Sequence, residues 1–222
     1  MTPHFLIAID GPAASGKSSV SKLLAKRLHC PHVNSGELYR AATYGILQSG
    51  ADPADPAAIA TAARTLKFAS VPHGTTFTTL VNGTSPGPHL RDAAVAASVS
   101  AISSVPAVRD ILTALLRQLA SGQNLIMEGR DIGSVVFPHT PFKFYIDASE
   151  TVRLHRRHAQ GETDSPLSRD KQDSTRKTAP LKISPDALVI DSTHLSLEDV
   201  VTRVLHHLEQ KGFSLPPAPP AS

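Results

Sequence analysis

Apolar residues along this chain follow two patterns, short runs of mostly apolar residues and stripes that recur every three or four positions. A run that ends in a polar or glycine turn is typical of a strand buried on both faces of a parallel sheet. Such runs cover residues 5–9, 124–128, 142–146 and 187–190, and a shorter strand is expected at 31–34. The stripes predict amphipathic helices over residues 18–28, 108–119, 149–160 and 197–210. Alternating strands and helices predict an α/β fold whose parallel sheet is covered on both faces.

Two stretches interrupt this alternation. Residues 51–66 are alanine-rich and helical in pattern, and residues 68–90 are rich in β-formers and turns, with a strand at 75–81 and a hairpin signal at Asn82-Gly83. We interpret these two segments as a small inserted subdomain. Residues 161–177 are charged and nearly devoid of large apolar side chains, so we expect a mobile lid there rather than core.

The composition fits one globular domain that carries inserts. Of 222 residues, 41% are hydrophobic and 18% are charged, and the net charge of +3 is spread along the chain, so we expect no nucleic-acid partner. The single cysteine, Cys30, excludes an intrachain disulfide. The apolar run that ends before Asp10 is too short for a signal peptide or a membrane span, and we expect a cytoplasmic protein without membrane contact.

A phosphate-binding loop follows the first predicted strand. It matches the pattern of Gly, four residues, Gly, Lys and Ser, between a buried strand and an amphipathic helix: Gly11, Pro12, Ala13, Ala14, Ser15, Gly16, Lys17 and Ser18. Backbone N–H groups and the positive end of the helix can hold an anion there. Lys17 can reach the β and γ phosphates, and the Ser18 hydroxyl can ligate Mg²⁺. We predict that these residues and Ser19 bind ATP with Mg²⁺ as cofactor.

The rest of the chain narrows the class of phosphate-loop protein. A loop that starts within the first dozen residues of this chain leaves room for one sheet and two inserts, but not for a motor. A GTPase would carry an Asn-Lys-x-Asp segment that reads guanine, and the sequence contains none. These features favour a kinase that acts on a small molecule.

Two arginines are expected beside the phosphate loop. Arg40 follows the strand at 31–34, and Arg130 follows the strand at 124–128. Open α/β sheets bind ligands at the carboxyl ends of their strands, and guanidinium groups there can hold a phosphate through paired hydrogen bonds. This placement indicates an acceptor that itself carries a phosphate.

Several longer segments together resemble bacterial cytidylate kinase. Besides the phosphate loop, they are residues 35–40, 99–109, 128–138 and 169–181, and the likeness extends from about Phe5 to Leu208. The most specific segment is Gly-Arg-Asp-Ile-Gly at 129–133, followed by Val-Val-Phe-Pro. The resemblance implies a three-layer kinase fold with a five-stranded parallel sheet in the order 2-3-1-4-5, an inserted monophosphate-binding region and a lid.

The resemblance also implies a role for individual residues. Ser35, Arg40 and Arg130 match substrate contacts, with the two arginines on the phosphate of CMP. The cytosine-reading positions of the family are matched by Ser100, Arg109 and Asp131. There, the carboxylate accepts a hydrogen bond from the exocyclic amine, and the arginine donates to the ring carbonyl and nitrogen.

The lid and the catalytic cations are matched as well. Asp173 is expected to face the sugar, while Arg169 and Arg176 reach the transferred phosphoryl group. Lys17 and Arg130 complete the expected catalytic set. Apart from the resemblance, one of the arginines at the start of the lid, Arg153, Arg156 or Arg157, is expected to contact ATP, and we assign this contact to Arg157.

Three features depart from the family pattern. Asn34 stands where an acid is expected, residues 92–95 replace a Thr or Ser, any residue, Glu, Val stretch, and the lid is short. These departures bear on helix capping and on the lid more than on the reaction.

These observations together predict one kinase domain over residues 1–212. Its core covers 1–40, 91–152 and 179–212, its monophosphate-binding insert about 41–90, and its lid about 153–178, and a disordered proline-rich tail follows at 213–222. We predict a monomer that phosphorylates CMP and dCMP with ATP. A kinase for another small acceptor, such as UMP, and a nucleotide-binding regulator remain alternatives.

Overall fold

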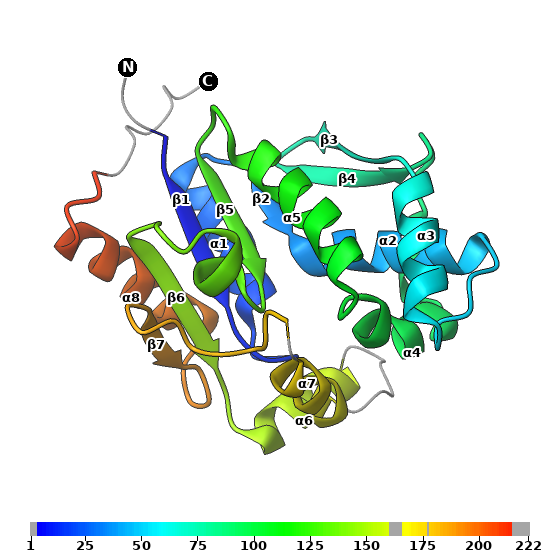
Figure 1. Ribbon diagram of the computed structural model, residues 1–222. Coiled ribbons are helices and arrows are strands. Elements are labelled where there is room, and N and C mark those ends of the chain that lie inside the picture. The colour runs from blue at the N-terminus through cyan, green and yellow to red at the C-terminus, as the bar shows by residue number, and fades with distance from the viewer. Residues whose placement is uncertain (1–3, 160–165, 177, 215–222) are drawn as a thin grey trace.

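The computed structural model describes residues 4–159, 166–176 and 178–214, without the side chains of residues 166–169. Its main sheet has five parallel strands in the order β2-β5-β1-β6-β7 (Figure 1). The strands are β1 (Leu6–Asp10), β2 (His32–Asn34), β5 (Leu125–Gly129), β6 (Phe142–Asp147) and β7 (Leu188–Asp191). Numbered along the chain without the hairpin strands, this is the order 2-3-1-4-5, so the expected topology is confirmed.

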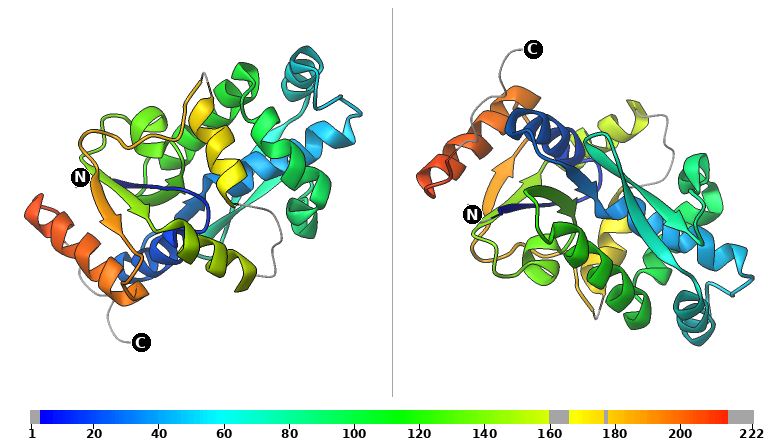
Figure 2. Two further views of the ribbon diagram at one scale, coloured as in Figure 1. Left: turned by 90° about the horizontal axis from the view of Figure 1, so that it is seen from below. Right: turned by 90° about the horizontal axis from the view of Figure 1, so that it is seen from above.

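Helices cover both faces of the main sheet. On one face, α1 (Lys17–Leu28) and α8 (Leu197–Gln210) pack side by side (Figure 2). The other face is covered by α2 (Ser35–Gln48), α5 (Pro106–Ala120) and a short π-helix, η2 (Ile132–Val136). Side chains alternate along β1. Ile7 and Ile9 pack on the face covered by α1 and α8, and Ala8 packs on the face covered by α2 and α5. Strands buried in this way explain the apolar runs of the sequence.

The expected insert contains four further elements, and one more helix follows it. They are α3 (Pro56–Thr65), β3 (Phe68–His73), β4 (Thr76–Val81), the 3₁₀ helix η1 (Gly87–Arg91) and α4 (Ala93–Ile102). Its α3 has no core of its own, because Ile59 and Ala63 share a core with Leu125 and Met127 of β5. The boundary expected near residue 41 lies inside α2, a continuous helix.

The hairpin in the insert turns at a different place from the one predicted. Gly74 and Thr75 connect β3 to β4. Asn82-Gly83 forms a separate tight turn after β4, with φ of 51° and 83° at its two residues, and it closes only a single bridge between Val81 and Thr84. The Asn-Gly pair therefore marked a genuine turn, but the proline and glycine residues after Thr84 prevent a second strand.

The proline-rich tail begins later than expected. Phe213 was assigned to a disordered tail, but its side chain is buried, with its ring edge-on to Phe5 and Phe142 at centroid distances of 4.8 and 5.2 Å. Its ring partners are far away in the sequence, so no local pattern predicts that Phe213 is buried. Residues 215–222 lie outside the described residues.

The two remaining helices belong to the expected lid region. They are α6 (Glu150–Ala159) and α7 (Pro166–Thr175), which contact each other. Among the described residues, no single helix is long and apolar enough to cross a membrane, and the one pair that reaches the required length and composition, α4 with α5, is bent by 97°.

Candidate active site

The phosphate loop connects β1 to α1 with a backbone that only certain residues can adopt. Gly11 and Gly16 have φ of 154° and 94°, and Ala14 has φ of 58°. A Cβ on Gly11 would lie 2.1 Å from the carbonyl oxygen of Ile146, so a side chain at this position is excluded. The loop thus leads directly into the N-terminus of α1, which is the arrangement that binds phosphate.

Lys17 is the first residue of α1, and its side chain lies folded against the loop. Its ammonium group donates to the carbonyl oxygen of Pro12 at 3.0 Å. Burial, together with the neighbouring charge of Arg130, lowers the pKa of Lys17 to about 7. Nearby carboxylates oppose this shift only in part. A buried cation that has lost its hydration interacts strongly with an anion that reaches it.

Ser18 lies against a carboxylate that the sequence analysis did not identify. Its hydroxyl donates to Glu128 Oε2 at 2.6 Å, and the other oxygen of Glu128 is 3.1 Å from His32 Nε2. Burial alone would raise the pKa of Glu128, but the hydrogen bonds from His32 and Ser18 and the charge of Lys17 together hold it below its usual value. Glu128 therefore stands as an ionised carboxylate beside the phosphate loop.

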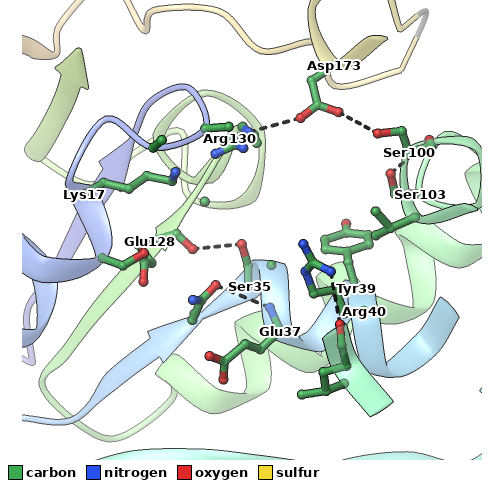
Figure 3. A pocket seen from close by; sticks show the side chains of 18 of the residues that line it. Lys17, Ser35, Glu37, Tyr39, Arg40, Ser100, Ser103, Glu128, Arg130 and Asp173 are labelled. Atoms are coloured by element: carbon green, nitrogen blue, oxygen red, sulfur yellow. Dashed lines mark hydrogen bonds and ion pairs between the residues drawn. The ribbon is translucent and has the colours of Figure 1, made fainter. Parts of the chain in front are cut away.

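Arg130 emerges from the end of β5 and contacts both the phosphate loop and α7. Its Nη1 donates to the carbonyl oxygen of Gly11 at 2.8 Å, and its Nε donates to Asp173 at 3.0 Å (Figure 3). Arg40, on α2, donates to the carbonyl oxygen of Leu90 at 3.0 Å. The Ser35 hydroxyl donates to the Glu128 carbonyl at 2.8 Å, which fixes the start of α2 to the end of β5.

Arg109 and Asp131 meet in a buried ion pair. The guanidinium of Arg109 also donates to the carbonyl oxygen of Ser103 at 3.3 Å and lies 5.4 Å from the centre of the Tyr39 ring. Burial raises the pKa of Asp131, and the charge of Arg109 is the main opposing effect. A carboxylate and a guanidinium fixed side by side can offer an acceptor and donors to one planar ligand edge.

Two carboxylates of α7 connect the lid to the rest of the site. Asp173 is buried and pairs with Arg130 and Arg176, with the Ser100 hydroxyl 3.4 Å away. Asp170 accepts a hydrogen bond from the backbone N–H of Ala13 at 2.8 Å. It also pairs with Arg153 of α6. Ion pairs and hydrogen bonds of these two carboxylates therefore dock α7 against the site, which agrees with its charged sequence.

One cavity of about 630 Å³ collects most of the predicted site residues. Of the residues named in the sequence analysis, it is lined by Ala13, Ala14, Gly16, Lys17, Ser18, Ser19, Ser35, Arg40, Ser100, Arg109, Arg130, Asp131, Arg157, Asp173 and Arg176. Gly11, Pro12 and Ser15 are buried and do not line it. The side chain of Arg169 lies outside the described residues, although its backbone belongs to α7.

The charge of the cavity wall favours anions. Among the described side chains, eight basic ones line it, namely Lys17, Lys22, Arg40, Arg91, Arg109, Arg130, Arg157 and Arg176. Four carboxylates accompany them, those of Glu37, Glu128, Asp131 and Asp173. Such an excess of positive charge in a concave site attracts ligands that carry several negative charges.

Sequence reasoning missed contacts that depend on distant elements. Glu128 lies opposite Ile9 in the register of β5 and β1, and an acid within an otherwise apolar strand was the available signal for it. Arg156 donates to the phosphate loop, at the carbonyl oxygen of Ser15, and to the Ser192 hydroxyl, while Arg157 lines the cavity. No local pattern separates these two neighbouring arginines.

Comparison with known proteins identifies the family. A model of the cytidylate kinase family matches residues 7–210. The chain belongs to the cytidylate kinase family. It is 40% identical over 216 residues to the cytidylate kinase of Rhodococcus jostii (strain RHA1), which covers 92% of this chain and 94% of the relative. Cytidylate kinases of Limosilactobacillus reuteri (strain DSM 20016) and Geobacillus kaustophilus (strain HTA426) are each 38% identical, covering 89% and 95% of this chain and 92% and 99% of the relatives.

Membership in the cytidylate kinase family confirms the resemblance that the sequence motifs indicated and makes this chain a kinase. One departure from the family pattern has a simple structural outcome. Asn34 caps α2, because its side-chain oxygen accepts a hydrogen bond from the backbone N–H of Glu37 at 3.3 Å. Asn and Asp serve about equally well as N-caps, so the amide does not disturb the helix.

Proposed function

We propose that this enzyme transfers the γ-phosphoryl group of ATP to the phosphate of CMP or dCMP. One observation carries the proposal: the phosphate loop with Lys17 and the buried pair of Arg109 with Asp131 line the same cavity. A triphosphate site and a site for a planar base edge are thereby combined in one space. Arg130 binds Gly11 of the loop and also lines the cavity, so it can hold a phosphate between the triphosphate site and the base site.

The donor ATP is assigned to the phosphate loop and the N-terminus of α1. Lys17 and the loop N–H groups would hold the β and γ phosphates, and Arg157 would contact the nucleotide. Mg²⁺ fits this chain, because the Ser18 hydroxyl and the ionised Glu128 carboxylate are hard oxygen donors 2.6 Å apart beside the loop. When bound, Mg²⁺ supplies neutralisation of the charge that develops on the phosphate oxygens.

The acceptor phosphate is assigned to Arg40 and Arg130, with Ser35 at the start of α2. Both guanidinium groups line the cavity, with Arg40 on α2 and Arg130 beside Lys17 at the end of β5 (Figure 3). Arg176 and Arg169 of the lid would reach the transferred phosphoryl group. Asp173 already pairs with Arg130 and Arg176, so it can hold these two cations in place and face the sugar.

The cytosine ring is assigned to Arg109, Asp131 and Ser100. The Asp131 carboxylate can accept from an exocyclic amine, while Arg109 can donate to the ring carbonyl and nitrogen. Because both groups are buried, a base that cannot complete these hydrogen bonds leaves them desolvated and unpaired.

The reaction needs no dedicated general base. A nucleoside monophosphate has a second phosphate pKa of about 6, so its oxygen is already an anionic nucleophile at neutral pH. Catalysis is then a matter of aligning the two phosphates and stabilising charge in a site that excludes water. Lys17, Arg130 and the lid arginines supply that charge. All of the proposed ligands belong to one chain, so we propose that the enzyme acts as a monomer.

Steady-state kinetics with a panel of acceptors tests this function. Purified enzyme is supplied with Mg²⁺ and ATP, and ADP formation is followed with CMP, dCMP, UMP and AMP and with no acceptor. We expect turnover with CMP and dCMP, little with UMP or AMP, and a negligible rate without acceptor. Turnover with UMP at the rate of CMP would favour a kinase for another acceptor. No acceptor-dependent turnover would favour a nucleotide-binding regulator.

A further inference from the structure

Asp10, the last residue of β1, has a buried carboxylate that forms no ion pair with the described residues. Its Oδ1 accepts a hydrogen bond from the backbone N–H of Ile132 at 2.8 Å, and its Oδ2 accepts one from the N–H of Gly133 at 2.8 Å. Asp10 lies opposite Gly129 in the parallel register of β1 and β5. The carboxylate therefore reaches across from the phosphate-loop strand to the segment that follows β5.

That segment carries two of the side chains assigned to the acceptor. Arg130 and Asp131 immediately precede the two N–H groups that Asp10 binds. Arg130 in turn donates to the carbonyl oxygen of Gly11, the residue after Asp10. Asp10 and Gly11, at the point where β1 leads into the phosphate loop, thus both bind the segment that carries Arg130 and Asp131.

The packing around Gly133 leaves little room for another arrangement. A Cβ at this position would lie 3.2 Å from the side-chain carbons of Lys143 and 3.4 Å from Asp10 Oδ2. Lys143 is itself fixed, since its ammonium group donates to the carbonyl oxygen of Pro138 and pairs with Asp186. Because this packing leaves the segment little freedom, we expect the loss of one hydrogen bond to Asp10 to shift the backbone at residues 132–133.

We propose that Asp10 is a positioning residue for the phosphoryl acceptor: its two hydrogen bonds to the backbone of Ile132 and Gly133 set where Arg130 and Asp131 stand relative to the phosphate loop. This inference rests on the proposed function. Asp10 itself does not contact the substrate. It belongs to β1, the strand that leads into the phosphate loop, and it positions residues of the acceptor site.

An ionised carboxylate suits this task, because both of its oxygens accept hydrogen bonds. A carboxamide offers one oxygen, and its NH₂ group would face an N–H donor. Burial nevertheless raises the pKa of Asp10 to about 6, against the opposing effect of the two backbone N–H groups. The charged and titratable groups that act on it are Asp131, Lys17, Arg130 and the Tyr145 hydroxyl.

The test compares Asp10→Asn with wild type and with Asp147→Asn as a matched control. Asp147 ends the neighbouring strand β6, and its side chain accepts only from the N–H of the adjacent Ala148 among its hydrogen bonds in the described residues. At pH 8 we expect Asp10→Asn to lower kcat/KM for CMP by at least about tenfold. The dissociation constant of ATP should change less than about twofold, since no ATP ligand is removed. Asp147→Asn should match wild type in both quantities.

A second readout separates positioning from a general loss of structure. Between pH 5 and 8, kcat/KM of wild type should show an acid limb near pH 6 that is reduced in Asp10→Asn, while the limb caused by the CMP phosphate stays in both enzymes. Equal losses of ATP affinity and CMP turnover, or identical pH profiles, would overturn the proposal. If Asp10→Asn has the same kcat/KM for CMP as wild type and Asp147→Asn, the proposal is also overturned. If wild type prefers another monophosphate, the proposed function fails, and the Asp10 comparison is made with that acceptor.

Discussion

Arg109 and Asp131 form an ion pair in which both side chains are almost fully buried, and both residues line the cavity that the phosphate loop also lines. The pair comes from two distant segments, the first turns of α5 and the residue after Arg130. Both residues line the cavity, so the pair can meet a ligand that enters it.

Base selectivity should depend on Asp131. Cytosine presents an amine donor where uracil presents a carbonyl acceptor, and a carboxylate facing that carbonyl leaves two acceptors without a proton between them. One such unmade hydrogen bond costs roughly 1 to 3 kcal/mol, so we expect kcat/KM for CMP to exceed that for UMP by at least about tenfold. In Asp131→Ala this preference should collapse. Steady-state kinetics of both enzymes with both substrates provide the measurement.

The control for this experiment is Asp110→Ala. Asp110 is next to Arg109 on α5, but its exposed side chain does not line the cavity, so its variant should keep the wild-type preference. If Asp131→Ala loses activity on CMP and UMP in equal proportion, Asp131 only holds Arg109 in place and does not read the base.

The acceptor arginines should affect the monophosphate more than ATP. We expect Arg130→Ala and Arg40→Ala to raise KM or lower kcat/KM for CMP by at least about tenfold while the dissociation constant of ATP changes little. Arg→Lys should also be costly at both positions, because an ammonium group cannot form the paired hydrogen bonds of a guanidinium. Binding titrations with each nucleotide and kinetics with CMP measure the two effects.

A suitable control is Arg27→Ala, because Arg27 makes an exposed ion pair with Glu198 far from the cavity. It should behave as wild type in every assay. An equal loss of ATP and CMP affinity in the Arg130 or Arg40 variants would show that the donor and acceptor sites have been interchanged.

ATP binding should take up a proton at Lys17. Its pKa of about 7 leaves the amine largely neutral at pH 8, and a bound triphosphate stabilises the charged form and raises the pKa. At pH 8 we expect an uptake approaching about one proton at this residue. At pH 6 the lysine is already charged, so the uptake should disappear. Calorimetric titrations in buffers of different ionisation enthalpy measure the number of protons.

Lys17→Arg provides the comparison, because a guanidinium stays charged throughout this pH range. It should bind ATP at pH 8 without the Lys17 component of proton uptake. Identical proton uptake by the two enzymes would contradict a lowered pKa at Lys17.

Asp10 should reduce stability as the pH rises. Its native pKa of about 6 lies above the ordinary value of 3.8, so between these values the folded protein binds the proton more tightly than the unfolded chain does. Stability from this group is therefore lost as pH increases through that window. Relative to wild type, the free energy of unfolding of Asp10→Asn should increase by roughly 1 kcal/mol between pH 5 and pH 8. Denaturant titrations at the two pH values check this, and a difference that does not change with pH would contradict it.

Much of the fold could be predicted from the sequence, because the strands are buried on both faces. Mostly apolar runs placed four of the five parallel strands within one residue of their observed ends, and the helix at residues 197–210 agrees with α8 at both ends. The phosphate loop was equally plain, since its glycines and Lys17 are adjacent in sequence. The strand order came from the family resemblance and not from periodicity.

The remaining site residues depend on contacts between distant segments. The sequence analysis did not assign Glu128 to the site, because its partners Ser18 and His32 come from α1 and β2. Phe213 looked like the first residue of a tail, since its partners lie more than 70 residues away. Asp10 follows the same rule, because its carboxylate binds backbone groups that no side-chain motif reveals.

Transfer of the γ-phosphoryl group to CMP is tested most directly by phosphorus NMR of a mixture of enzyme, Mg²⁺, ATP and CMP. We predict that ATP and CMP signals decay together while those of ADP and CDP grow in equal amounts, with almost no inorganic phosphate. Lys17→Ala, which removes a preorganised charge from a loop, should remain folded and show no transfer over the same period. Release of inorganic phosphate with CMP unchanged, or no consumption of either nucleotide by the wild-type enzyme, would contradict the proposed function.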